Sequence, residues 1–355
     1  MVLSMERRVD NFKRLYACEN ERPLIGFSAV SEYPLVRYPA AQDLPGDRAL
    51  RPDDFDPALY ARDNLRLYEI HEEYGGDFIF SAGPFQGIPW IEAFAGMELF
   101  AHQKSGVIYA RPPKGREPTL NSGAFTDRHG WAALARSMIE EDVKTAGGRY
   151  PLGVTRMRGV SDVLLALRGD QFVFDMIDNP EEAEKACSAI ADIIISFGRM
   201  QLSYIPGFHG GLGSFFYNAW VPEGTVWLQE DAVALLSPKL YHDFIEKHLA
   251  RIAAAFPHCV IHQHPVGFLP WESYIDTGML ALELHIDEGG PAAPELHEVH
   301  TGILARKPLI IWGKITISEL EDIFQKLPHH GLAVSCIVED RMEASEIWER
   351  FGADG

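Results

Sequence analysis

An apolar strand and the break that ends it are recognisable in Val260-Ile261-His262-Gln263-His264-Pro265-Val266-Gly267. A helical segment from Pro238 to Phe256 precedes this strand, and the strand Leu280–His285 follows it after a further short helix. From Thr225 onward the chain continues in the same way, with strands and helices in alternation and short connections between them. This order favours parallel strands in an α/β fold.

Strand candidates, about eight in all, are spread over the whole length, without a linker or an internal repeat. We therefore predict a single (β/α)8 TIM-barrel domain over residues 1–355. Helical excursions are expected in the N-terminal part, together with a hairpin within residues 98–120. A doubly wound open sheet is the rival fold, but the GxGxxG segment that would support it after the first strand is absent.

Composition and charge limit the classes of partner. The chain has 355 residues, 46% of them hydrophobic, and its formal net charge of −19 disfavours nucleic acid and anionic membranes as partners. Its cysteines, Cys18, Cys187, Cys259 and Cys336, are widely separated, which is typical of a reducing compartment. Neither a secretory signal nor an apolar run of about 18 residues is present, so we expect a cytoplasmic protein.

The two histidines at the end of the quoted strand are the strongest chemical signal. Because side chains alternate along a strand, His262 and His264 should point to the same side, where two imidazoles can bind one metal ion. A third ligand must come from elsewhere, and we choose Cys336, near the end of the apolar run 332–336. The alternative is that both histidines are hydrogen-bonded residues around an organic substrate, without a metal.

Further polar residues follow other predicted strands. Trp90 and Glu92 come shortly after the strand 77–81, where they would line a pocket or pack a helical turn. Arg156 and Arg158 stand at the end of the strand 152–155. They could hold a carboxylate or a phosphate, or form structural salt bridges.

Four stretches together resemble the uroporphyrinogen decarboxylase superfamily, and specifically its corrinoid-linked methyltransferase branch. The segment Ile88–Gly96 is similar to the Trp-x-Glu-Ala-x-x-Gly segment of that branch, and residues 158–181 look like its middle region. Residues 230–241 match its pre-helix element, and His262-Gln263-His264 with Cys336 falls where the branch has a His-x-Cys pair and a distant Cys. The resemblance implies a (β/α)8 barrel, a zinc site and methyl transfer between a small substrate and a corrinoid.

Two departures from the family pattern matter. The strand end that begins at Ile25 carries no arginine, whereas the decarboxylase itself has an arginine-rich signature there, so porphyrinogen decarboxylation is disfavoured. His264 stands where the methyltransferases that use thiols have cysteine. Two imidazoles and one thiolate are less electron-rich than one imidazole and two thiolates, which favours an ether or alkoxide oxygen as the bound group.

We therefore predict a zinc-dependent methyltransferase of O-demethylase type, acting between a small methoxy compound and a corrinoid. No Asp-x-His-x-x-Gly segment is present, so the corrinoid (cobalamin) would be carried by a partner protein or be free. The assigned metal ligands are His262, His264 and Cys336. The residues assigned to catalysis are Glu283, His285 and Glu92. The assigned substrate contacts are Trp90, Arg156, His209 and Tyr217.

Two other functions fit the same residues. One is a metal-independent decarboxylase or lyase that uses histidines and arginines on an acidic small molecule. The other is a non-catalytic barrel that binds a corrinoid or another small ligand. Metal analysis separates the first from the methyltransferase, and turnover with a methylated donor and free cobalamin excludes the second.

Overall fold

The structure is a computed structural model and describes residues 3–28, 31, 33–115, 120 and 130–352. Across these residues, a seven-stranded parallel sheet has the order β1-β12-β11-β10-β9-β8-β5. A smaller sheet of order β4-β6-β7 lies beside it, and β2 and β3 form an antiparallel hairpin. The strands are β1 (Leu24–Ser28), β2 (Glu98–His102), β3 (Val107–Arg111), β4 (Gly153–Thr155), β5 (Met157–Arg158), β6 (Gly211–Phe215), β7 (Ala219–Pro222), β8 (Thr225–Gln229), β9 (His258–Gln263), β10 (Ala281–Ile286), β11 (Leu309–Gly313) and β12 (Leu332–Ile337).

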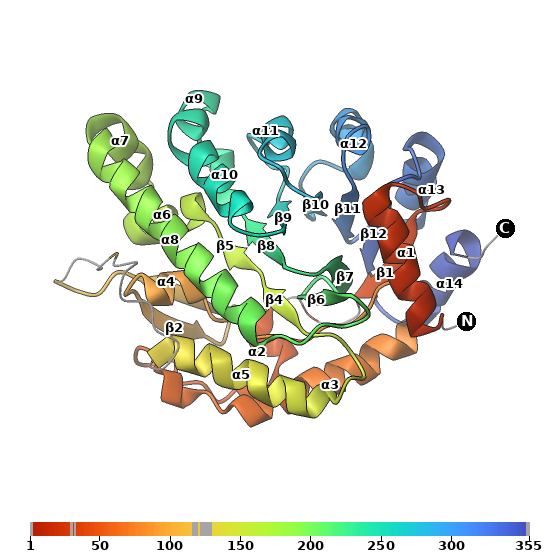
Figure 1. Ribbon diagram of the computed structural model, residues 1–355, viewed down its shortest axis with the longest axis horizontal. Coiled ribbons are helices and arrows are strands. Elements are labelled where there is room, and N and C mark those ends of the chain that lie inside the picture. The colour runs from red at the N-terminus through yellow and green to blue at the C-terminus, as the bar shows by residue number, and fades with distance from the viewer. Residues whose placement is uncertain (1–2, 29–30, 32, 116–119, 121–129, 353–355) are drawn as a thin grey trace.

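Helices alternate with the strands of the C-terminal half, as predicted from the sequence. Figure 1 shows α8, α10, α11, α12 and α13 along the outer side of the arc of strands. The helices are α1 (Met5–Ala17), α2 (Pro34–Arg37), α3 (Pro57–Tyr74), α4 (Trp90–Phe94), α5 (Gly130–Ala146), α6 (Val160–Arg168), α7 (Gln171–Asp178), α8 (Pro180–Tyr204), α9 (Pro238–Leu240), α10 (Glu246–Ala254), α11 (Trp271–Asp276), α12 (His297–Leu304), α13 (Ile317–Lys326) and α14 (Arg341–Phe351).

Local sequence accounts for several of these boundaries. A capping box of Thr316 and Glu319 starts α13, and the Asp340 side chain accepts hydrogen bonds from two backbone amides at the start of α14. Strands β9 to β12 are almost entirely buried, and β11 and β12 are mainly apolar, as expected for strands covered on both faces. The hairpin predicted within 98–120 is present as β2 and β3, while residues 116–119 lie outside the described part of the chain.

The α/β class with a parallel sheet is confirmed, but a closed barrel is not detected in the described residues, where β1 and β5 are the edges of the main sheet. The predicted second strand, 77–81, lies between β1 and the start of β4 without forming a ladder. The Asp77 amide donates to the Ile25 carbonyl at 2.8 Å, and Ala82 forms an isolated bridge with Leu152.

Side-chain hydrogen bonds explain why the ladder is missing there. The Ile25 amide donates to the Asp77 carboxylate at 2.9 Å, and the Ser81 hydroxyl donates to the Ser214 carbonyl at 2.7 Å. These bonds replace part of the backbone pairing that a regular strand would make.

The register of the sheet decides which side chains share a face. Glu283 is paired with His262 across β9 and β10, and His285 is paired with Trp312 across β10 and β11. These residues face away from the outer helices, whereas the alternate residue Gln263 bonds to the Tyr274 hydroxyl of α11. We call the first side the inner face, and the candidate site lies on it.

Candidate metal centre

The two histidines of the quoted stretch lie together on the inner face, as their spacing predicts. His262 is fully buried in β9, and His264 follows the end of that strand and is partly exposed. Their ring centroids are 4.8 Å apart and the rings are nearly perpendicular. The ring of His285, from β10, lies 4.7 Å from that of His264. Three imidazoles thus gather at the carboxyl ends of two neighbouring strands.

Each of the first two imidazoles is held by a carboxylate through Nδ1. His262 Nδ1 bonds to Glu283 Oε2 directly across the ladder, and His264 Nδ1 lies 2.7 Å from Asp287 Oδ2. A carboxylate on one ring nitrogen is the usual way in which proteins orient a metal-binding histidine. The other nitrogen of each ring, Nε2, therefore stays available for a ligand.

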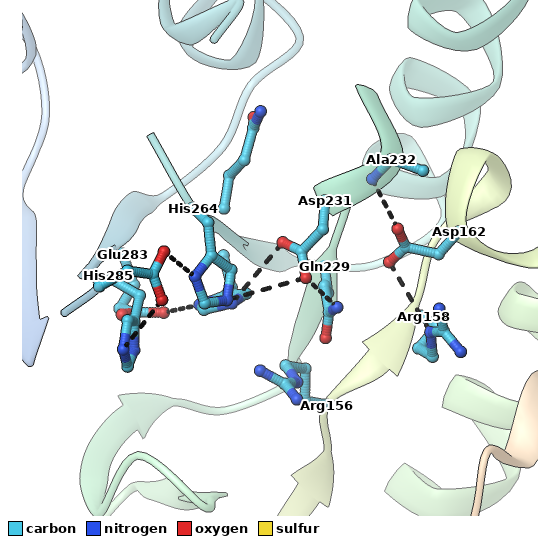
Figure 2. A network of polar contacts seen from close by, with 12 residues as sticks. Arg156, Arg158, Asp162, Gln229, Asp231, Ala232, His264, Glu283 and His285 are labelled. Carbon is cyan, nitrogen blue, oxygen red and sulfur yellow. Dashed lines mark hydrogen bonds and ion pairs between the residues drawn. The ribbon is translucent and has the colours of Figure 1, made fainter. Parts of the chain in front are cut away.

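Both Nε2 atoms face Asp231, which follows the end of β8. His262 Nε2 lies 3.7 Å from Asp231 Oδ1, and His264 Nε2 lies 3.8 Å from Asp231 Oδ2. These distances are too long for good hydrogen bonds, yet all three groups offer lone pairs to the space between them. Figure 2 shows Asp231 and His264 turned toward each other, with Gln229 bonded to the same carboxylate.

Two atoms of this group are buried without a hydrogen-bond partner: His262 Nε2 and Asp231 Oδ1. Buried polar atoms of this kind normally have a partner. Two imidazole nitrogens and one carboxylate oxygen form a common protein ligand set for Zn²⁺ and other divalent metals. The residues Asp231, His262 and His264 therefore fit a metal ion, and their ligand atoms all lie within 4.8 Å of one another.

A second group of potential ligands shares His264 and adds His285 and Asp287. His285 Nε2 lies 3.6 Å from Asp287 Oδ1, while His264 Nδ1 is already bonded to the same carboxylate. The first group is the better metal site, because its two histidines keep a nitrogen that no carboxylate holds. Asp287 then acts as the partner that orients His264.

Burial keeps the imidazoles in the form that binds a metal. It lowers the pKa of His262 well below its ordinary value, although the charge of Asp231 opposes this shift. For His285, burial and the neighbouring histidines lower the pKa to about 3. Both rings are therefore neutral at physiological pH and present a lone pair.

Cys336 is not brought to the histidines. The register pairs its neighbour Ser335 with Trp312, whose ring lies 4.3 Å from that of His285. Because side chains alternate, Cys336 points to the opposite face of the sheet. Burial, together with Glu343 of α14, raises the pKa of this thiol to about 12. This corrects our expectation of a thiolate ligand, and Asp231 occupies the place expected for it.

Tyr217 reaches the site from the turn between β6 and β7. Its ring stacks on Trp227 at 4.3 Å and lies 5.7 Å from the ring of His262. The flanking residues Phe216 and Asn218 have φ values of 88° and 55°, which are unusual for residues other than glycine. Backbone strain of this kind is often found at functional sites, and here it aims Tyr217 at the histidines.

Arg156 and Trp90 line a cavity of about 210 Å³ that adjoins this tyrosine. The Arg156 guanidinium donates to the Tyr217 hydroxyl at 2.9 Å. Trp90 is buried in α4, and its indole N–H donates to the Phe85 carbonyl at 3.1 Å. Two predicted substrate contacts thus line the cavity, and the third, Tyr217, lies between Arg156 and His262.

Two further predicted residues lie away from the histidines. His209 precedes β6 and therefore stands at the amino end of that strand. Glu92 is buried in α4 and forms an ion pair with Arg158 at 2.5 Å. The position of His209 corrects the expectation that it contacts substrate, because the carboxyl ends of the strands are at the opposite edge. Glu92 has a structural partner where we expected a proton-transfer role.

Sequence reasoning missed three residues of this region. Asp231 stands just after a predicted strand, which was its signal, but a thiolate was preferred as the third ligand. Asp287 follows His285 by two positions, so alternation could have placed both carboxylate and imidazole on the inner face. Gln86, beside Arg156, has no sequence signal that distinguishes it.

A larger groove of about 840 Å³ lies elsewhere, along α6, α7 and α8, and its lining residues within the described part of the chain include no histidine. The chemistry on the inner face therefore identifies the site better than cavity size does. No helix within the described ranges is long and apolar enough to cross a membrane.

Comparison with known protein families gives no match, and no curated protein matches the sequence. Among solved structures, a methyltransferase from Methanosarcina mazei is similar, with a TM-score of 0.67 and 14% identity over 98% of this chain and 98% of that chain. The metallated homocysteine methyltransferase MmuM from Escherichia coli aligns over 94% of this chain and 98% of that one, with a TM-score of 0.43 and 11% identity. The first likeness shows a shared fold.

Proposed function

We propose that this chain is a zinc-dependent methyltransferase that moves a methyl group between a small methoxy compound and a corrinoid. The proposal rests on the convergence of two imidazole Nε2 atoms and the Asp231 carboxylate. Two atoms of this set are buried without a hydrogen-bond partner. The shared fold with a solved methyltransferase agrees with it. We also propose that the arc of strands works as a (β/α)8 barrel, with residues 77–82 in the place of the strand that closes it.

Asp231, His262 and His264 would hold the metal ion. When bound, zinc supplies Lewis acidity toward an ether oxygen, and the corrinoid supplies the nucleophile for the methyl group. A carboxylate is a weaker electron donor than a thiolate. This ligand set therefore suits an oxygen-bound substrate better than a thiol, in line with the preference for an ether.

The surrounding residues of the chain would position and shield the substrate. Glu283 and Asp287 hold the two imidazoles through Nδ1, so that both Nε2 atoms stay aimed at one point. Tyr217 and Trp312 form an aromatic wall around His262 and His285 that limits the access of water. His285, neutral because of its burial, would orient the substrate by hydrogen bonding.

A metal-independent decarboxylase or lyase is the second candidate. It is favoured by the Arg156 guanidinium, which faces a cavity and would suit an acidic substrate. In that case the inner-face histidines would serve as acids or bases without a metal. The metal content of the purified protein distinguishes the two functions.

The test combines metal analysis with methyl transfer. Purified protein, zinc-loaded or metal-depleted, is mixed with methoxy compounds and free cob(I)alamin, and methylcobalamin formation is followed by absorbance. We expect transfer only with zinc, and we expect His262→Ala to lose about one metal equivalent and the transfer together. His242→Ala, at an exposed histidine, is the matched control. Unchanged metal content in His262→Ala would refute the site.

A further inference from the structure

Arg156 differs from a structural arginine in its set of partners. Its Nη1 donates to the Tyr217 hydroxyl at 2.9 Å. With the Gln86 amide oxygen turned toward it, Nη2 and Nε donate to that oxygen at 2.9 and 3.2 Å. These partners are neutral, and they orient the guanidinium plane without neutralising its charge.

The hydrogen-bond count leaves two donors over. A guanidinium has five N–H groups, of which Tyr217 takes one and Gln86 takes two. One N–H therefore remains on each terminal nitrogen. Two such donors in one plane match the two oxygens of a carboxylate.

The charge of Arg156 also has no close counterpart. In the part of the chain that the structure describes, no carboxylate lies within ion-pair distance of it, and Asp231 and Glu283 act on it from farther away. Arg158, two residues on, is paired with Glu92 at 2.5 Å and with Asp162 at 3.9 Å. The two arginines at the same strand end therefore have different roles.

The position of Arg156 connects the cavity with the metal centre. It lines the cavity of about 210 Å³ together with Gln86, Trp90 and Phe216. Its guanidinium carbon lies 5.5 Å from the ring centroid of Phe216, on the cavity wall, and 5.8 Å from that of Tyr217, which borders His262. Figure 2 shows Arg156 near Asp231 and Gln229, on the side of the sheet that carries the histidines.

We propose that Arg156 binds a carboxylate of the substrate, so that the methyl donor or acceptor is a small methoxy carboxylic acid. The methoxy group of this substrate rests on the proposed function, and its carboxylate rests on the geometry of Arg156. The acid group would lie against Arg156 in the cavity, and the ether oxygen would reach past Tyr217 toward the histidines. Phosphate suits the site less, because its second negative charge would face Asp231 and Glu283 with one cation to balance it.

Matched probes test the inference by binding. Methoxyacetate and 3-methoxybenzoate are each compared with their neutral amides by calorimetry, on metal-free and on zinc-loaded protein. We expect each acid to bind on the order of ten- to a hundredfold more tightly than its amide, because two charge-assisted hydrogen bonds are lost with the charge. Methyl phosphate is the third arm, and it should bind more weakly than methoxyacetate.

Variants assign the preference to this residue. Arg156→Gln should bring the acid-to-amide ratio of affinities close to one. Arg156→Lys should keep part of the acid preference, because lysine keeps the positive charge but lacks the paired N–H donors of a guanidinium. Lys314→Gln removes an exposed cation that follows β11 and should leave the ratio unchanged. If Arg156→Gln does not fold, the wild-type affinity ratio and the ratio for Arg156→Lys still test the carboxylate subsite.

The outcomes separate this inference from the proposed function. Equal affinity for acids and amides, an unchanged ratio in Arg156→Gln, or tighter binding of methyl phosphate overturns the carboxylate subsite. An acid preference that depends on Arg156, without methyl transfer from any probe, supports the subsite and refutes the methyltransferase. Transfer from neutral ethers as fast as from acids supports the methyltransferase and refutes the subsite.

Discussion

His262 and Glu283 are direct neighbours across the β9–β10 ladder, and the carboxylate of one bonds to the Nδ1 of the other in a fully buried setting. The bond leaves His262 Nε2 without a partner and aimed toward Asp231. The pair therefore sets the geometry of the candidate metal centre before any metal is bound.

Replacing the third ligand tests the assignment of Asp231 over Cys336. Asp231→Ala should lose about one equivalent of zinc, because two imidazoles alone bind it weakly. Cys336→Ala should keep its zinc, because this thiol points to the other face of the sheet. Metal content after dialysis, measured by plasma mass spectrometry, checks both variants. Loss of zinc in Cys336→Ala with retention in Asp231→Ala would reverse the assignment.

Glu283 should act as a positioning residue. Glu283→Gln keeps the size of the side chain but weakens its hold on His262 Nδ1, so zinc affinity should fall about 10- to 100-fold. Competition with a chromophoric chelator measures the change. Glu288→Gln, at an exposed position a few residues away, should leave the affinity unaltered. Equal affinities in both variants would mean that Glu283 does not orient the histidine.

Glu92 should matter for stability and not for the metal. Glu92→Gln removes the buried partner of Arg158, and we expect the free energy of unfolding to fall by about 1–3 kcal/mol. The loss should be below that of a fully buried pair, since Arg158 is 35% exposed and water screens it. Urea denaturation measures this, with the exposed Glu98→Gln as control. A stable variant that loses zinc would contradict the structural role.

A buried carboxyl in α5 should make stability depend on pH. Burial raises the pKa of Asp142 to about 8, although the amide of Asn64 donates a hydrogen bond to it at 2.9 Å. Because the folded pKa lies above the unfolded one, this contribution is full below about pH 4 and is lost as pH rises through about 8. Between these two pH values the free energy of unfolding should fall by roughly 1.4 kcal/mol per pH unit, because one proton is involved.

Asp142→Asn removes this titration, so the variant should gain stability relative to the wild type between pH 5 and pH 8. Denaturation curves at several pH values give the difference, and Glu140→Gln on the exposed side of the same helix controls for net charge. Parallel pH profiles for Asp142→Asn and the wild type would contradict the prediction.

Local patterns predicted part of the sheet. Strands β10 and β12 lie within one residue of the segments 280–285 and 332–336 that indicated them, because burial on both faces leaves a largely hydrophobic signature. The segment 77–81 has a similar signature but forms no ladder. The Asp77 side chain accepts a hydrogen bond from the Ile25 amide. Such a bond depends on the tertiary packing of two segments that are distant in the sequence.

By itself the sequence determined the alternation of strands and helices and the common direction of His262 and His264, since both follow from periods of two to four residues. Tertiary structure decided which carboxylate joins them and left Cys336 on the far face. The reason is physical: the face of a side chain depends on the register between strands, and the register of β12 against β11 is fixed by packing over the whole sheet. The same packing brought Asp231, Tyr217 and Arg156 to one edge, and no local pattern encodes that meeting.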